Sequence, residues 1–263
     1  MRRVDLNADL GESFGVYTLG DDAALLRVVT SANVACGFHA GDPSTMARAV
    51  GLAAASGVAL GAHPGLPDLA GFGRRRLDIT PAEVRDLVTY QIGALAGFAA
   101  REEQTVQHVK PHGALYALAE ENPAVAAAIA QAVREWDGTL IVFGQSGGGL
   151  VAAGNALGLQ TASEVFADRA YSPDGSLVPR SLPNAVLHDP EIVAARMAHW
   201  ARTGTLLAAD GTTALTLTAD TICLHGDSPG ASALAGRVRS VLEAEGVSVQ
   251  SVKQSVKQEV RKP

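Results

Sequence analysis

The stretch NVACGFHAGDP, residues 33 to 43, begins like a buried strand and ends like the start of a helix. Its closing Asp42-Pro43 pair joins a polar N-cap to a proline at the first helical position, where a missing N–H costs nothing. The same signal recurs at Thr80-Pro81, Asn122-Pro123, Asp189-Pro190 and Ser228-Pro229. We therefore predict helices that begin at these five pairs.

Short apolar runs typical of strands precede most of these helices. They span residues 4–8, 31–36, 58–63, 105–110, 139–143, 159–166 and 220–225. Strands that alternate with helices predict right-handed βαβ units and a parallel sheet. Polar residues follow nearly every predicted strand, as they would if all the loops met at one mouth. A closed barrel is therefore favoured over a doubly wound sheet.

The composition suits one large domain that binds small molecules or proteins. Of 263 residues, 47% are hydrophobic and 18% are charged, and the formal net charge of −6 argues against a nucleic-acid surface. We expect a single barrel over residues 1–250 and a polar tail, disordered or loosely attached, over 251–263, where SVKQ repeats without an apolar stripe. No run approaches the roughly 18 apolar residues of a membrane span, and no signal-peptide pattern precedes Val4. Free thiols at Cys36 and Cys223 fit the cytoplasmic location that we expect.

The first predicted strand carries three polar residues at a period of two. Asp5, Asn7 and Asp9 therefore share one side of an extended chain, and Glu12 follows them. Such side chains are expensive inside a barrel unless they lie at its mouth. A structural role, in which Asp5 or Asn7 bonds to neighbouring backbone, is the alternative.

Histidines stand at the ends of four other predicted strands, at His39, His63, His112 and His225. A lone histidine on a strand is more often a satisfied core residue than a ligand, but four at one barrel mouth favour a site. His39 and His63, with Asp9 or Asp42, form a set that suits Zn, Mn or Fe. No HExxH or paired CxxC spacing accompanies them.

Two further kinds of chemistry remain open at these strand ends. Cys36 could act as a nucleophile beside a histidine, although a small buried residue that closes a strand is the more common role. Phosphate could bind to Lys110, Arg169 or Arg180, or to the glycine run GQSGGGL at residues 144–150. That run matches neither the P-loop nor the dinucleotide-binding pattern.

Seven blocks of the sequence together resemble the LamB/YcsF family. In chain order over about residues 4 to 250 they are DLNADLGE, ANVACGFHAGDP, GAHPG, HVKPHGALY, EVFADRAY, LVPR and LHGD. The resemblance implies an irregular seven-stranded β/α (TIM-like) barrel of the glycoside hydrolase/deacetylase type. It also implies ATP-dependent hydrolytic opening of 5-oxoproline to L-glutamate, with this chain as the A component beside partner subunits B and C.

The implied reaction can be weighed against the residues. A lactam is a resonance-stabilised amide, and phosphorylation of its oxygen by ATP would give water a better electrophile. The catalytic candidates are Asp9, His39, Lys110, Glu164 and His225. The substrate-binding candidates are Asn7, His63, His112, Arg169 and Arg180, and the metal candidates are Asp9, His39 and His63.

Alternatives to this function stay open. One is a metal-dependent amide or carbohydrate deacetylase, and the other is a non-catalytic lactam-binding subunit that regulates its partners. Because the sequence lacks a P-loop, ATP either binds this barrel in an unconventional way or uses a site that a partner completes. The divalent metal would be Mg with ATP or a bound transition metal, and the sequence is compatible with a homo-oligomer.

Overall fold

The computed structural model describes residues 2–226 and 230–252. Seven parallel strands form a closed barrel, in the order β1-β2-β3-β4-β5-β6-β9, because β9 pairs with both β6 and β1. The barrel strands are β1 (Arg3–Leu10), β2 (Ser31–Ala35), β3 (Ala59–His63), β4 (Val106–Val109), β5 (Ile141–Gln145), β6 (Gln160–Phe166) and β9 (Thr221–Leu224). The predicted TIM-like α/β barrel and its seven strands are confirmed.

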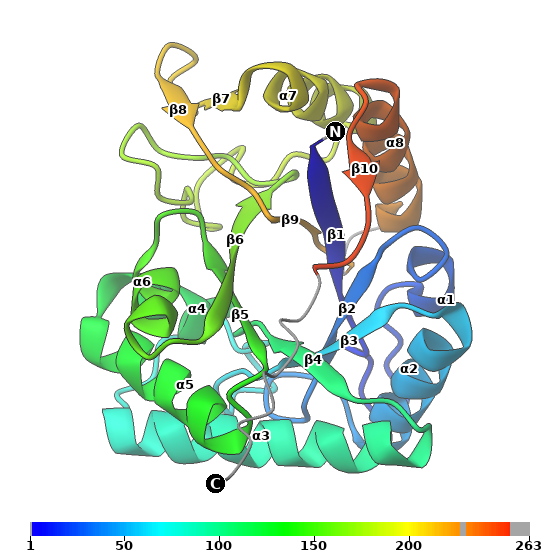
Figure 1. Ribbon diagram of the computed structural model, residues 1–263, viewed down its shortest axis with the longest axis vertical. Coiled ribbons are helices and arrows are strands. Elements are labelled where there is room, and N and C mark those ends of the chain that lie inside the picture. The colour runs from blue at the N-terminus through cyan, green and yellow to red at the C-terminus, as the bar shows by residue number, and fades with distance from the viewer. Residues whose placement is uncertain (1, 227–229, 253–263) are drawn as a thin grey trace, which may run out of the picture.

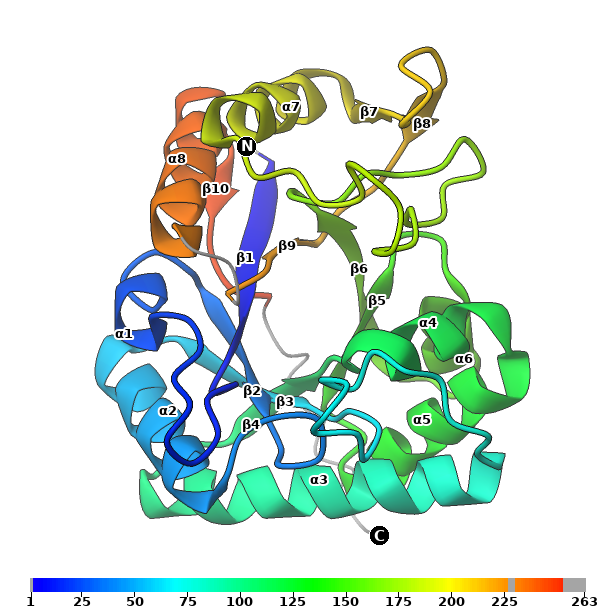
Figure 2. The same cartoon turned by 180° about the vertical axis from the view of Figure 1, so that it is seen from behind.

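Helices surround the ring of strands, as Figures 1 and 2 show from opposite sides. They are α1 (Asp22–Leu25), α2 (Pro43–Ser56), α3 (Pro81–Arg101), α4 (Gly113–Glu121), α5 (Pro123–Trp136), α6 (Gly149–Ala156), α7 (Pro190–Thr203) and α8 (Ala231–Ala244). Four of the predicted helix starts are confirmed, with N-caps at Asp42, Thr80, Asn122 and Asp189. The fifth, Ser228-Pro229, lies outside the described residues, as do Asp227 and the tail from residue 253 onward.

Smaller elements complete the chain. The hairpin of β7 (Thr205–Leu207) and β8 (Ala214–Thr216) follows α7, and the three lie together at one end of the molecule (Figure 2). Strand β10 (Ser248–Val249) pairs in parallel with the start of β1. These elements, together with α1, α4 and α6, were not predicted from the sequence.

The apolar core lies mainly between the strands and the helices, whereas much of the barrel interior is polar. Along β1, Leu6 and Ala8 belong to the core, while Asp5 and Asn7 bond to side chains of other strands. The period of two therefore separates an apolar outer face from a polar inner face. No helix among the described residues is long and apolar enough to cross a membrane.

Candidate active site at the barrel mouth

A cavity of about 1040 Å³ opens at the carboxyl ends of the barrel strands. Asp9, Lys110 and His225 line it, and so does part of the loop that follows β6. Others of the sequence-predicted residues in its lining are His63, His112, Arg169 and Arg180. His39, Asn7 and Glu164 are not part of the lining but contact residues that are.

One side of the cavity holds the histidine cluster, which consists of Glu12, His39, His63 and His112. One potential ligand atom from each of these buried residues lies within 4.8 Å of those of the others. The ring of His39 stacks on that of His112, with centroids 3.8 Å apart. Burial, and then the neighbouring imidazoles, lowers the pKa values of His39 and His112 well below the ordinary value.

Next to this cluster lies the lysine network, which consists of Asn7, Asp9, Lys110, Glu164 and Cys223. The Lys110 ammonium nitrogen is 2.8 Å from Asp9 Oδ1, 3.3 Å from Glu164 Oε1 and 2.9 Å from Cys223 Sγ. Burial alone would lower the pKa of Lys110, but Asp9, Cys223 and Glu164 raise it well above its usual value. The network is therefore built around a permanently charged, buried cation.

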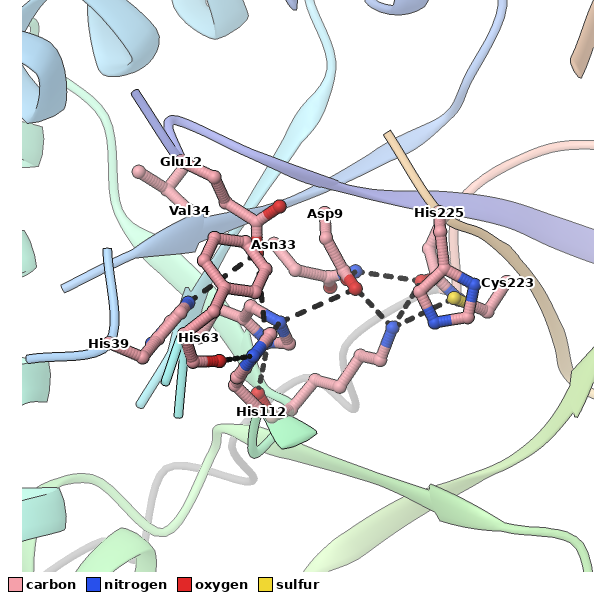
Figure 3. Close-up of polar contacts among 12 residues, drawn as sticks. Asp9, Glu12, Asn33, Val34, His39, His63, His112, Cys223 and His225 are labelled. Atoms are coloured by element: carbon pink, nitrogen blue, oxygen red, sulfur yellow. Dashed lines mark hydrogen bonds and ion pairs between the residues drawn. The ribbon is translucent and has the colours of Figure 1, made fainter. Parts of the chain in front are cut away.

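Asp9 joins the two groups, as Figure 3 shows, with the histidines on one side of it and Cys223 and His225 on the other. Its Oδ1 accepts hydrogen bonds from Lys110 and Asn33, and its Oδ2 is 3.4 Å from His63 Nε2. Burial alone would raise the pKa of Asp9, but His63 and Lys110 hold it well below the usual range. Asp9 is thus a carboxylate held in its ionised form, with Oδ1 engaged by Lys110 and Asn33 and Oδ2 facing His63.

Asn7 uses its whole amide within the barrel. Its Nδ2 donates to Glu164 Oε1 and Thr221 Oγ1, and its Oδ1 accepts from Asn33 and Lys110. No hydrogen-bonding capacity remains for a substrate, so the expected substrate-binding role of Asn7 becomes one of positioning Lys110 and Glu164. The alternative of bonding to neighbouring backbone is also replaced, because these partners are side chains.

The opposite side of the cavity carries a buried aspartate–histidine pair. His225 Nδ1 lies 2.9 Å from Asp168 Oδ2, and the backbone N–H of His225 donates to the same carboxylate oxygen. Because a carboxylate only accepts, the proton sits on Nδ1 and Nε2 of the neutral ring keeps a lone pair. Burial would raise the pKa of Asp168, but its contacts with His225, which include two hydrogen bonds, and the charge of Arg180 hold it below the usual value.

The two predicted arginines have different surroundings. Arg169 is buried and donates to the carbonyl oxygens of Ala185 and Val178, so it holds the loop between β6 and α7 in place. Burial, and then the charge of Arg180, lowers the pKa of Arg169 to about 10. Arg180 lines the cavity. Both arginines thus stand in the wall of the cavity, and two donors of Arg169 are committed to the loop.

The glycine run at residues 144–150 does not offer the open anion site that its composition indicates. It leads into α6, whose first N–H, that of Gly149, donates to the carboxylate of Glu120 at 2.6 Å. An anionic side chain thus occupies the helix N-terminus where a phosphate would bind. In this structure the Glu120 carboxylate, and not a phosphate, accepts the hydrogen bond from the first N–H of α6.

Cys36 also has a structural explanation. Its thiol is buried and donates to the carbonyl of Val34, and burial raises its pKa to about 12. A thiol with so high a pKa is a poor nucleophile. Asp42 caps α2, as its position before Pro43 predicts.

Glu12, Asn33 and Asp168 belong to the site but were not among the predicted site residues. The signals were present, because Glu12 and Asp168 lie just after β1 and β6 and Asn33 pairs in register with Asp9 on β1. The ends of predicted strands show which residues lie near a barrel site. Which of these residues contact one another, when they are more than 20 positions apart, can be known only from the register of the strands.

Comparison with known proteins agrees with this architecture. The model of the LamB/YcsF family matches residues 4–257. The chain belongs to the LamB/YcsF family. It is 52% identical over 248 residues to the A subunit of 5-oxoprolinase from Bordetella pertussis, an alignment that covers 94% of this chain and 98% of that protein. It is 53% identical over 251 residues to the corresponding 5-oxoprolinase chain from Limosilactobacillus fermentum, covering 95% and 100%.

A solved structure resembles this LamB/YcsF chain over nearly its whole length. It is the crystal structure of a lactam utilization protein from Thermus thermophilus, with a TM-score of 0.89 and 45% identity. The match covers 95% of this chain and 100% of that one.

Proposed function

We propose that this chain is the hydrolytic component of an ATP-dependent 5-oxoprolinase, which opens 5-oxoproline to L-glutamate. The observation that carries the proposal is the Asp168–His225 pair beside the buried Lys110 cation in one cavity. An oriented base next to a fixed positive charge suits the addition of water to an activated amide. The names of the two 5-oxoprolinase relatives supply the substrate.

The proposed reaction balances as follows. ATP transfers its terminal phosphoryl group to the lactam oxygen, which weakens amide resonance. Water then adds to the same carbon, the ring C–N bond breaks, and the nitrogen takes a proton. Cleavage of the C–N bond leaves an acyl phosphate, and a second water hydrolyses it to inorganic phosphate and the side-chain carboxylate of glutamate.

Each step has a candidate residue in the cavity. His225 Nε2 accepts the proton of water, while Asp168 fixes the ring and stabilises its charged form. The charge of Lys110 favours the developing negative charge, and its partners Asp9 and Glu164 hold it in place. Arg180 pairs with the substrate carboxylate.

We propose that the nucleotide site is completed by partner subunits B and C. Glu120 already occupies the N-terminus of α6, which supports a phosphoryl donor that approaches from outside this barrel. Mg bound to ATP would then arrive with the nucleotide.

A reconstitution assay tests the proposal. The chain alone, and then with subunits B and C, is given 5-oxoproline and ATP, and glutamate and ADP are measured. We expect coupled formation of both products only in the complex. His225→Ala should abolish glutamate formation, whereas the exposed His199→Ala is a matched control that should retain it. Full turnover by the isolated chain would contradict dependence on partners, and normal turnover by His225→Ala would contradict a catalytic role for that residue.

A second candidate function is a metal-dependent amide or carbohydrate deacetylase, which the histidine cluster favours. Release of acetate from an N-acetylated sugar in the absence of ATP would support the deacetylase over the 5-oxoprolinase. A third, a lactam-binding subunit without catalysis, would be supported if the complex containing both His225→Ala and Lys110→Met kept wild-type turnover.

A further inference from the structure

The histidine cluster has a feature that the proposed reaction does not use. His63 Nδ1 lies 2.6 Å from the carbonyl oxygen of Lys110, and His112 Nε2 lies 2.8 Å from that of Phe72. A carbonyl oxygen only accepts, so both of these ring nitrogens carry protons. In the neutral rings the other two nitrogens, His63 Nε2 and His112 Nδ1, are therefore bare.

Those two bare nitrogens face one another at 3.0 Å. Two lone pairs at this distance repel unless a proton or a metal cation lies between or beside them. Two carboxylate oxygens lie next to these nitrogens and increase the negative potential there. Glu12 Oε1 is 3.5 Å from His112 Nδ1, and Asp9 Oδ2 is 3.4 Å from His63 Nε2. The arrangement is thus complementary to positive charge.

His39 supplies an independent observation. The residue is 1% exposed, and neither of its ring nitrogens makes a hydrogen bond to any described residue. Its Nε2 lies 3.4 Å from Glu12 Oε1, so it points into the same cluster. A buried imidazole without a partner is costly, and a ligand at the cluster would satisfy it.

We propose that Glu12, His39, His63 and His112 bind one divalent transition-metal ion. Three imidazoles and a carboxylate suit Zn, Mn, Fe or Co. A tetrahedral ion with ligands about 2.1 Å away separates them by about 3.4 Å. The contacts of 3.0, 3.4 and 3.5 Å within the cluster are close to that spacing.

The surrounding backbone supports this ligand set. Metal-bound histidines typically donate their second N–H to a carbonyl or carboxylate, as His63 and His112 do here. The carbonyl that serves His112 belongs to Phe72, which adopts a left-handed φ of 54° that bulky residues rarely take. A Cβ at Gly65 would lie 2.4 Å from His39 Nδ1, so glycine there leaves room for the ring.

This set differs from the metal candidates Asp9, His39 and His63 expected from the sequence. Glu12 and His112 take the place of Asp9, because their ligand atoms lie within 4.8 Å of those of His39 and His63, whereas Asp9 belongs to a separate group with Cys223 and His225. His63 and His112 also line the cavity, which gives the ion access to a ligand there. A metal at this place would act as a Lewis acid toward an oxygen of that ligand.

Metal binding can be measured without turnover. The purified full chain is stripped with a chelator, reloaded separately with Zn²⁺, Mn²⁺ or Co²⁺, and passed through a desalting column before elemental analysis. We expect stoichiometric retention of at least one of these metals, a rise in thermal unfolding temperature, and a Co²⁺ absorption spectrum with nitrogen ligands. His63→Ala and His112→Ala should lose the metal, and Glu12→Gln, which removes a charged ligand, should weaken its affinity by more than the roughly 10- to 100-fold that loss of an outer-shell partner costs.

His225→Ala is the matched control, because His225 belongs to the other possible ligand group of the cavity, with Asp9 and Cys223. We expect it to retain the metal. Loss of metal from His225→Ala but not from His112→Ala, or no retention by the wild-type chain, would overturn the proposal. Should the histidine variants fail to fold, the wild-type stoichiometry and Co²⁺ spectrum still decide it. If the wild-type chain retains the metal but its complex with subunits B and C forms no glutamate, the proposed reaction is contradicted and the metal site is not.

Discussion

The two sides of the cavity solve the problem of buried polarity in opposite ways. In the lysine network, Lys110 is surrounded by Asp9, Glu164 and Asn7, and the chain itself supplies every opposing charge. In the histidine cluster, bare nitrogens face one another and a carboxylate. The lysine network therefore contains its own cation. The histidine cluster instead presents nitrogens and a carboxylate that are complementary to a cation from outside the chain.

This difference separates two kinds of contribution to function. A network in which side chains of the same chain hold a buried cation in place can keep a strong local field without reorganisation, which suits stabilisation of developing charge. A cluster whose buried lone pairs face one another is complementary to a cation, which is the role proposed for it above. Substitutions on the two sides should therefore affect different measurements.

The largest effect is expected for Lys110→Met, which leaves Asp9 and Glu164 buried without their cation. Removing one partner of a buried ion pair costs about 3–5 kcal/mol of stability. We expect that loss in urea unfolding at neutral pH, together with loss of glutamate formation. The loss should shrink as the pH falls, because the buried Asp9 of the variant has lost the charge of Lys110 and can take up a proton, whereas the partners of wild-type Asp9 hold its pKa well below the usual value.

A suitable control for Lys110→Met is Arg76→Ala, which removes an ion pair with Glu121 at the rim of the same cavity. Both partners are more than half exposed, so the pair contributes at most about 1 kcal/mol. Equal losses in the two variants would show that burial does not set the strength of the lysine network.

The next effect concerns catalysis more than stability. In Asp168→Asn, the amide can donate to His225 Nδ1 and thereby shift the ring proton to Nε2, so the base is lost. The corresponding change in Ser-His-Asp enzymes lowers kcat by roughly 10⁴-fold. We expect a fall of at least roughly 100-fold in kcat of the reconstituted complex, with metal retention unchanged.

Asp189→Asn is the matched control for this substitution, because Asp189 caps α7 on the surface and asparagine is an equally good N-cap. It should keep wild-type kcat. An Asp168→Asn enzyme with a normal kcat would mean that the pair is structural and that the base lies elsewhere.

The sequence predicts the architecture well because repeated local signals determine it. Pro at the first helical position and the capping box of Thr80 and Glu83 act within a few residues, and the structure contains both. The strand ends likewise identify His63, Lys110 and His225 as mouth residues.

The hydrogen-bond partners of the site residues could not be predicted from such local signals. Glu120 looks like an ordinary helix residue until the fold brings it to the N-terminus of α6, 29 positions further on. Arg169 looks like an anion binder until its donors are found on loop carbonyls. Long-range register decides which polar groups are already satisfied, and only unsatisfied ones can serve a ligand.

The smallest expected effect concerns Asp5, a buried carboxyl group on β1 one inward-facing position before Asn7 of the lysine network. Asp5 has no cation beside it among the described residues and accepts hydrogen bonds from the hydroxyls of Thr30, Ser31 and Thr221. Burial raises its pKa from 3.8 to about 6, so the folded protein binds this proton more tightly than the unfolded chain does. Its stabilising contribution is therefore complete below the unfolded pKa and is lost as the pH rises through about 6.

Asp5→Asn removes this titration and so isolates it. Relative to the variant, the wild-type protein should gain up to about 3 kcal/mol of unfolding free energy as the pH falls from about 7 to about 4, the energy equivalent of the raised pKa. Urea unfolding at several pH values measures the difference, with the exposed Asp86→Asn as the matched substitution outside the barrel. Parallel stability curves for wild type and Asp5→Asn would mean that three hydroxyl donors stabilise a buried carboxylate as well as Lys110 does. A widening gap toward acid pH would show instead that three hydroxyl donors do not offset the burial of Asp5, whereas His63 and Lys110 do offset the burial of Asp9.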